Sequence, residues 1–316
     1  MAISPNVSGG FAALAAVFFF SVNDAVIKAL SDGYALHQVM FIRSIIGLFV
    51  VVCIFAPFSG GLCVFRTQRL TMHLLRGMFV VMANMSFFLS IATLALADAV
   101  AIFFVSPLVI TVFSVIFLRE TVGPWRWAAV VIGLIGVLVI VRPGSDAFQI
   151  ASLLPIFAAV CYAALHILTR KIGATEGAVT MAFYIQITFV LVSLISGLVL
   201  GDGKFAGSDN PTLSFLLRAW GPILSDDIWR FAVIGIGIAL AGVLISYAYR
   251  MGEAAFVAPF EYVAMPLAIL YGVIFFGEVP DAQTYLGSTL IVGSGLIMLW
   301  REHSKSRNPL ARPARR

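Results

Sequence analysis

Charged side chains are scarce in this chain of 316 residues, of which only 11% are Asp, Glu, Lys or Arg. A soluble domain usually carries about 25% charged residues. The deficit runs along the whole sequence, 61% of the residues are hydrophobic, and the mean hydropathy is +1.04. This composition excludes an ordinary soluble domain and predicts a polytopic membrane protein.

Cysteines and catalytic motifs are also few. Cys53, Cys63 and Cys161 are odd in number and lack metal-ligand spacing, so we expect no disulfide framework, metal or cofactor. No G-x-x-x-x-G-K-[ST], H-E-x-x-H or G-x-S-x-G pattern occurs, and the four histidines are scattered. Catalytic residues are therefore not expected. A membrane-embedded enzyme and a channel, which would need a continuous polar stripe, remain alternatives.

The two ends of the chain carry different signals. The start, MAISPNVSGGF, has no basic region, so we interpret the first apolar run as a retained span instead of a cleaved signal peptide. Six of the twenty basic residues lie in the last sixteen positions. We expect residues 301–316 to form a basic cytoplasmic tail at the membrane surface, with no nucleic-acid partner.

Apolar runs of about 20 residues, the length that crosses a hydrocarbon core, recur along the chain. Ten membrane-spanning helices are predicted, near Phe11–Leu30, His37–Pro57, Met72–Thr93, Ala99–Leu118, Trp125–Val141, Ala151–Thr169, Val179–Leu200, Ile228–Tyr249, Ala255–Phe276 and Thr284–Trp300. The long polar break at Gly201–Asp227 is expected to hold a short surface helix at WGPIL and to end in a helix cap at SDD.

Lys and Arg are distributed unevenly between the two sides that these spans define. If the N-terminus is cytoplasmic, cytoplasmic segments hold fourteen basic residues, Arg76 among them, against six on the other side. Cytoplasmic loops are enriched in Lys and Arg. We therefore expect both termini in the cytoplasm, and a bacterial inner (plasma) membrane location.

The two halves of the sequence resemble each other. A shift of 143 residues pairs AAV at 15–17 with AAV at 158–160, and Lys28 with Lys171. Each half also has a proline about one span before a Glu: PLVITVFSVIFLRE ends at Glu120, and PLAILYGVIFFGE ends at Glu278. We predict one five-helix repeat at residues 11–141 and a second at 150–300. Because five spans is an odd number, the copies insert in opposite orientations, an arrangement common in secondary transporters.

The blocks ADAVAIFFVSPL…FLRE and MGEAAFVAPFEYVAMPL…FFGEVP resemble the drug/metabolite transporter superfamily, in particular its EamA-type members. The resemblance covers about residues 10 to 300. It implies an all-α integral membrane fold of ten helices in two inverted repeats, moving a small organic metabolite by alternating access. Similar proteins include riboflavin importers, S-adenosylmethionine carriers and amino-acid exporters. The first block reads RE at 119–120, where the family usually has GE.

Ionisable groups inside a membrane are functional-site hypotheses by default. Asn23 and Asp24 interrupt the first span, in the stretch SVNDAVIKAL. Lys28 lies four residues after Asp24, on the same helical face, so the two can pair. One reading is that this pair is structural, with Lys28 reaching towards the membrane surface. The other is that Asn23 and Asp24 border an aqueous cavity and bind substrate or a proton.

Glu261 and Tyr262 lie between Pro259 and Pro266 in an otherwise apolar span. Prolines free backbone groups that are tolerated only beside protein or water. We therefore expect Glu261 to line a pathway, the alternative being a carboxylate hydrogen-bonded to a neighbouring helix.

The repeat shift places His166 at the position of Asn23, and Gln186 at the position of Arg43. Symmetric placement would direct these four towards one cavity. Arg43 lies about two turns into its span, where it either attracts an anionic group or pairs with Asp24 or Asp98. A membrane histidine is also a common helix-packing residue.

The family resemblance implies a secondary transporter that takes up a vitamin-like molecule such as riboflavin. We expect Asp24 and Glu261 to be the leading binding or proton-coupling groups. Export of amino acids or related metabolites is the alternative. The expected partners are the small-molecule substrate, the lipid bilayer and protons, and a homodimer is left open.

Overall fold

The computed structural model describes residues 5–61, 65–119, 123–144, 149–172, 177–251 and 258–306. Within these ranges the chain is helical and contains no strand. The helices are α1 (Pro5–Leu30), α2 (Leu36–Val50), η1 (Val51–Phe55), α3 (Ala56–Phe58), α4 (Leu70–Ile91), α5 (Leu96–Phe103), α6 (Ser106–Leu118), α7 (Pro124–Val141), η3 (Ile150–Ser152), α8 (Leu153–Ile172), α9 (Ala178–Leu200), α10 (Pro211–Leu217), η4 (Ser225–Asp227), α11 (Ile228–Met251), η5 (Ala258–Val263), α13 (Ala264–Phe276) and α14 (Ala282–Ser306).

The segments expected from the apolar pattern coincide largely with helix where the structure describes them, and residues 255–257 lie outside the described ranges. Among the described residues, seven helical segments are long and apolar enough to cross a membrane, and Trp127–Val141 and Phe260–Phe276 are shorter apolar helices. The protein is therefore an all-helical, multi-pass membrane protein. Helix α14 continues to Ser306, past the expected end near Trp300, and residues 307–316 lie outside the described ranges, as does Glu120.

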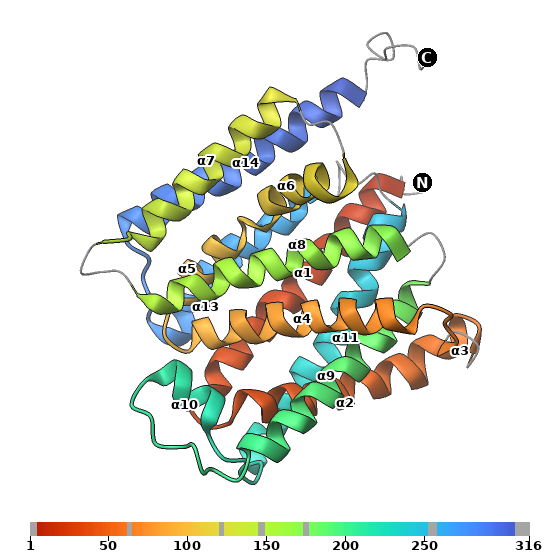
Figure 1. Cartoon of the computed structure of the whole chain (residues 1–316), viewed down its shortest axis with the longest axis vertical. Coiled ribbons are helices and arrows are strands. Elements are labelled where there is room, and N and C mark those ends of the chain that lie inside the picture. Colours follow the sequence, from red (N-terminus) through yellow and green to blue (C-terminus); the bar gives the residue numbers. More distant parts are fainter. Residues whose placement is uncertain are drawn as a thin grey trace.

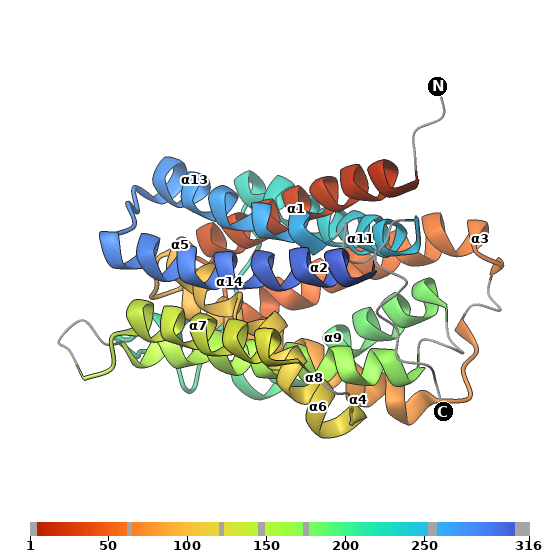
Figure 2. The ribbon, with the colours of Figure 1, turned by 90° about the horizontal axis from the view of Figure 1, so that it is seen from above.

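The helices form two groups that face each other. In the first group α1 packs against α11 and α13, and in the second α8 packs against α4, α5 and α6. Figure 2 shows α1, α11 and α13 on one side of the molecule and α4, α6 and α8 on the other. The two groups meet where α5 contacts α13 and where α1 contacts α4.

Two further helix pairs join these groups. Helix α2 packs against both α9 and α11, and α9 also packs against α4. Helices α7 and α14 run side by side along another face of the bundle (Figure 1). Most large contacts therefore join a helix from the first half of the chain to one from the second.

Proline shapes two of the membrane segments. Pro107 follows the break between α5 and α6, where Phe104 and Val105 leave the regular helix. In the second half, Ala258–Val263 forms a 3₁₀-helix before α13 begins. Short 3₁₀ segments within longer helices often mark hinges. Both interruptions lie on elements that meet between the two groups.

The polar segment at 201–227 differs from the expectation in one respect. Trp220–Leu224 forms no helix, and the short helix is α10, which begins at Pro211 after the Asn210 side chain accepts a hydrogen bond from the Leu213 backbone N–H. An Asn N-cap followed by Pro is a strong helix start, whereas Pro222 interrupts the expected one. Ser225–Asp227 is a 3₁₀ turn that leads into α11.

Segment 201–227 is bound to the turn between α1 and α2. Arg218 donates to the Ser31 carbonyl oxygen at 2.8 Å, and the Gln38 amide donates to the Gly221 carbonyl oxygen at 2.7 Å. The Tyr34 hydroxyl donates to Asp227 at 2.7 Å. We call this end of the bundle the α10 end (Figure 1). The long connection is thus fixed to the first half of the chain.

Another link at the α10 end joins Arg142, which follows α7, to Asp281, which precedes α14. The hydrogen bond from Arg142 holds the pKa of the Asp281 carboxyl below its ordinary value. This link joins two helices that also pack against each other along their length.

Helices α7 and α14 approach through glycines. A Cβ atom added to Gly287 would lie 2.6 Å from the carbonyl oxygen of Gly136, which is too close for any real side chain, and the obstacle is backbone. Small residues let membrane helices approach to this distance. By contrast, a Cβ on Gly293 of the same helix would have no heavy atom within 4 Å.

Gly287→Ala is therefore expected to lower the thermal unfolding temperature in detergent, because overpacking costs about 1–3 kcal/mol. Gly293→Ala is the matched control and is expected to leave the unfolding temperature unchanged or to raise it slightly. Equal unfolding temperatures for the two variants would contradict the close contact.

Candidate functional site

Polar residues gather between the two helix groups, where α1, α2 and α4 meet. Asn23 is buried, with 2% of its surface exposed, and its amide donates to the Asp24 carboxylate at 3.2 Å. Arg43 is 1% exposed and interacts electrostatically with Asp24. Of the two carboxylates considered as partners of Arg43, Asp24 interacts with it electrostatically, whereas Asp98 accepts a hydrogen bond from Thr284 at 2.6 Å.

Aromatic rings from two other helices flank Arg43. Its guanidinium carbon lies 5.6 Å from the centre of the Phe88 ring on α4 and 5.0 Å from the Phe189 ring on α9. Cation–π contacts of this kind gain energy when they are removed from water. They leave N–H donors unused: Arg43 Nε and Nη1 have no hydrogen-bond partner within the described ranges, nor does the Asn23 Oδ1 acceptor.

A second polar cluster lies where η5 faces α8. Glu261 interacts electrostatically with Tyr162 of α8 and with its neighbour Tyr262. The Tyr162 ring lies 4.4 Å from the His166 ring, one helical turn further along α8. Tyr262 also contacts Phe104, at the α5–α6 break, with ring centres 5.4 Å apart. Both proline-associated interruptions therefore contribute to this cluster.

Arg76 joins the second cluster from α4. Arg76 is 3% exposed, and its Nη2 atom donates to the Met181 carbonyl oxygen at 2.9 Å. Its guanidinium also interacts electrostatically with His166. The sequence places Arg76 in a cytoplasmic segment, and in the structure it lies buried in the second turn of α4. Its Nε atom has no hydrogen-bond partner in the described part of the chain.

A series of ring contacts connects the two clusters. Phe88 contacts Phe87 at 5.5 Å, Phe87 contacts Phe103 at 5.4 Å, and Phe103 contacts Tyr162 at 5.3 Å. The series leads from Arg43 to His166 through α4, α5 and α8. It provides flat apolar surfaces between polar groups, which is the usual character of a small-molecule site.

Four residues were expected around one cavity, and each has the following neighbours in the structure. Asn23 and Arg43 belong to the first cluster and His166 to the second. Gln186 is 7% exposed and packs against Gly47 of α2, where a Cβ would overlap its side chain. Gln186 therefore lies in the α2–α9 contact.

Lys28 has a different partner from the one considered above. Instead of pairing with Asp24, its Nζ atom lies 2.6 Å from Glu278, which follows α13. The reason is geometric, because Lys28 reaches the end of the bundle where α1 and α13 both finish. Residues 23–24 are thereby left to interact with Arg43.

The sequence alone did not identify Arg76 or the phenylalanine rings as site residues. Arg76 sits in the run LLRGMFVV, and an arginine this far inside an apolar run was a usable signal. The phenylalanines carried no signal, since 27 are spread along the chain.

An all-helical bundle with charged and aromatic side chains enclosed between two helix groups is typical of a membrane transporter. The comparisons agree: residues 7–142 match the model of the EamA-like transporter family. The chain is 32% identical over 245 residues to a riboflavin transporter of Vibrio cholerae, covering 77% of this chain and 76% of that protein. It is 30% identical over 249 residues to a riboflavin transporter of Rhizobium johnstonii, covering 79% and 76%.

Other relatives carry different names. The pseudopaline exporter CntI of Pseudomonas aeruginosa is 28% identical over 286 residues, covering 90% of this chain and 93% of that protein. A known crystal structure matches the fold with a TM-score of 0.62 at 18% identity, covering 94% of this chain and 99% of the other. The chain belongs to the EamA-like transporter family, within the drug/metabolite transporter superfamily, and is a transporter of small metabolites.

The Asp24–Arg43 interaction can be tested by a double-mutant cycle of thermal unfolding in detergent. Asp24→Asn and Arg43→Gln are each expected to lower the unfolding temperature, because each leaves the other group charged in a poorly solvated place. The double variant should lose less than the sum, with a coupling of about 1 kcal/mol. Asp24→Asn combined with Arg76→Gln is the control and should be additive. Additivity in both cycles would refute the interaction.

Proposed function

We propose that this protein is a riboflavin uptake transporter that works by alternating access between two inverted five-helix repeats in the bacterial inner membrane. The observation that carries the substrate assignment is the identity of 30% and 32% to two proteins named riboflavin transporters. In this proposal both termini face the cytoplasm, as the positive-inside pattern predicts.

The helix contacts support the repeats. If α1 corresponds to α8 and α4 to α11, the contact of α1 with α11 is the counterpart of the contact of α4 with α8. The α2–α9 and α7–α14 contacts each join a helix to its own counterpart. A two-fold axis in the membrane plane produces this pattern, and rocking the two groups about it would alternate access to a site between them.

The chemistry of the enclosed residues supports the substrate. Riboflavin has a flat tricyclic ring with carbonyl acceptors and a chain of hydroxyl groups. The rings of Phe103 and Tyr162 offer surfaces for stacking, and the unused donors of Arg43 suit ring carbonyl oxygens. The free acceptor of Asn23 and the carboxylate of Asp24 suit hydroxyl donors.

The remaining site residues receive narrower roles. We assign Glu261 to proton coupling, since it lies on the 3₁₀ segment and near two tyrosine hydroxyls. Tyr262 and His166 border the same cluster and would sense the charge of Glu261 and Arg76 respectively. Gln186 would act as packing in the α2–α9 contact.

A second candidate function is export of an amino-acid-like metabolite. Two observations favour it: the similarity to a pseudopaline exporter, and a buried guanidinium that would pair well with a carboxylate. Riboflavin has no carboxylate, so the two functions predict opposite preferences for anionic substrates.

Proteoliposomes containing the purified protein are expected to take up radiolabelled riboflavin with saturation. Tyr162→Ala should reduce uptake about two- to tenfold, because a lost stacking surface costs about 0.5–1.5 kcal/mol. Tyr285→Ala is the matched control, since Tyr285 is exposed on α14 and should leave uptake unchanged. Uptake of a carboxylate-bearing amino acid, with none of riboflavin, would favour the second function.

A proton gradient across the same vesicles tests the coupling role. Wild-type uptake should rise when the gradient is imposed, and uptake by Glu261→Gln should not respond to it. A variant that keeps the full response would remove Glu261 from proton coupling.

A further inference from the structure

Lys28 and Glu278 both bind the turn between α4 and α5, which belongs to the second helix group, at the α10 end. Besides their contact at 2.6 Å, Lys28 Nζ donates to the Leu94 carbonyl oxygen at 2.7 Å. The second Glu278 oxygen accepts a hydrogen bond from the Leu96 backbone N–H at 2.9 Å. We call Lys28, Glu278 and these two hydrogen bonds the clasp. It connects the ends of α1 and α13 to the turn between α4 and α5.

Each half of the clasp matches the helix end that it contacts. Leu96 is the first residue of α5, and the preceding residue, Ala95, makes no side-chain cap. A carboxylate at this position satisfies a free N–H and lies at the positive end of the helix dipole. Leu94 follows the end of α4. This is the negative end of the helix dipole, so a cation is favoured there. The backbone groups therefore determine which charge stands where: the cation beside the Leu94 carbonyl oxygen and the anion beside the Leu96 N–H.

The two charged partners lie in the same helix group. Lys28 ends α1 and Glu278 follows α13, and these helices pack against each other. If the two groups separated at this end, the clasp itself would lose only its hydrogen bonds to Leu94 and Leu96. Lys28 and Glu278 would keep each other, so no unpaired charge would be left in a poorly solvated place. Release of the clasp is therefore inexpensive compared with breaking an ion pair.

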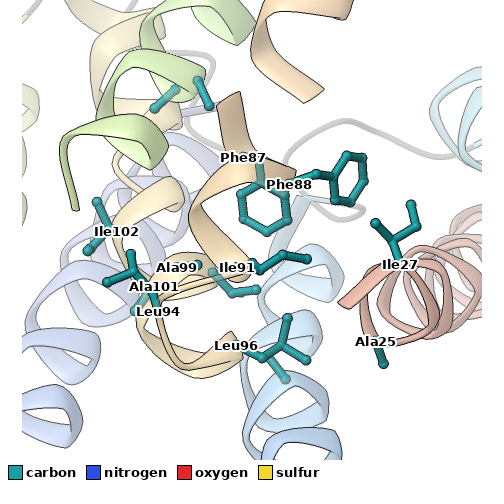
Figure 3. Close-up of a cluster of buried hydrophobic side chains, with 14 of the residues drawn as sticks. Ala25, Ile27, Phe87, Phe88, Ile91, Leu94, Leu96, Ala99, Ala101 and Ile102 are labelled. Atoms are coloured by element: carbon teal, nitrogen blue, oxygen red, sulfur yellow. The ribbon is translucent and has the colours of Figure 1, made fainter. Parts of the chain in front are cut away.

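Buried apolar residues lie beside the clasp. Figure 3 shows Ala25 and Ile27 of α1 near Ile91 and Leu96, which lie on either side of the α4–α5 turn. Ile27, Ile91 and Ala99 are fully buried. A water-soluble reagent can reach these positions only if the first and second groups separate at the α10 end.

We propose that the clasp keeps the transport pathway closed at the α10 end, and that its release from the α4–α5 turn is the step that opens this end. The proposal rests on the alternating access described above. It assigns Lys28 and Glu278 a positioning role in the transport cycle without contact to the substrate.

The experiment measures how fast a membrane-impermeant, positively charged thiol reagent modifies a single cysteine. The reporter is Ala99→Cys in a chain whose three native cysteines are replaced by serine, and Ala25→Cys serves as a second reporter. Reagent is applied to both sides of the membrane, in the absence of substrate. Lys28→Met and Glu278→Ala are each expected to raise the rate about tenfold, since each removes a charge-assisted hydrogen bond that favours the closed form.

Two controls separate the clasp from general loosening of this end. Lys28→Arg keeps a cationic donor and should leave the rate at the wild-type value. Asp281→Asn breaks the link to Arg142, which joins α7 to the start of α14, and leaves the hydrogen bonds to Leu94 and Leu96 in place. Its rate should also match the wild type. Gel filtration identifies any variant that is not folded.

The charge-swapped variant Lys28→Glu/Glu278→Lys gives the sharpest test. It preserves an ion pair but places a carboxylate beside the Leu94 carbonyl oxygen and an ammonium beside the Leu96 N–H. Rapid modification, as in the single variants, supports the clasp. A slow, wild-type rate in the swapped variant would overturn it, as would unchanged rates in both single variants or a rise in Asp281→Asn.

The readout does not depend on the substrate. If riboflavin is not transported but the modification rates follow the expected order, the clasp stands and the proposed substrate fails. If riboflavin is transported and the rates do not change, the clasp alone is wrong.

Discussion

The need to keep charge away from lipid governs this structure. A membrane helix satisfies its own backbone but can place a charged side chain only against protein or water. The described chain meets this constraint by enclosing Asp24, Arg43 and Arg76 between two helix groups. The outer surfaces carry many exposed apolar side chains, such as Leu134 and Ile135 of α7. The helices that enclose them come from both halves of the sequence.

The enclosed charges are not neutralised in the same way. Lys28 and Glu278 form a direct pair, whereas Arg43 depends on a nearby carboxylate and two aromatic rings. A direct pair with satisfied hydrogen bonds is stable as it stands. In the function proposed above, the ligand would use the unused donors of Arg43, because an unmade buried hydrogen bond is costly.

Much of the fold could be predicted from the sequence, because helix length and apolar composition are local properties. The interruption at Pro259–Pro266 was also expected, since proline acts on its immediate neighbours. The partner of Lys28 was not predictable from the sequence. Asp24 lies four residues away on the same helix and is the partner that spacing suggests. Glu278 lies 250 residues further along the chain and meets Lys28 only in the folded bundle. The same limitation hid the ring contacts around Tyr162. Membership of a cluster is a property of helix packing, and a single sequence does not display it.

The pairing of helices across the two halves has a consequence for biosynthesis. A chain leaving the ribosome exposes α1 and α4 to the membrane before α11 and α8 exist. Asp24 and Arg43 are synthesised within twenty residues of each other and can associate early. Lys28 must wait for Glu278, which at about 5–20 residues per second means roughly 10–50 s of synthesis. During that interval the first half is an incomplete bundle, and its assembly must be delayed or assisted until the second half is inserted.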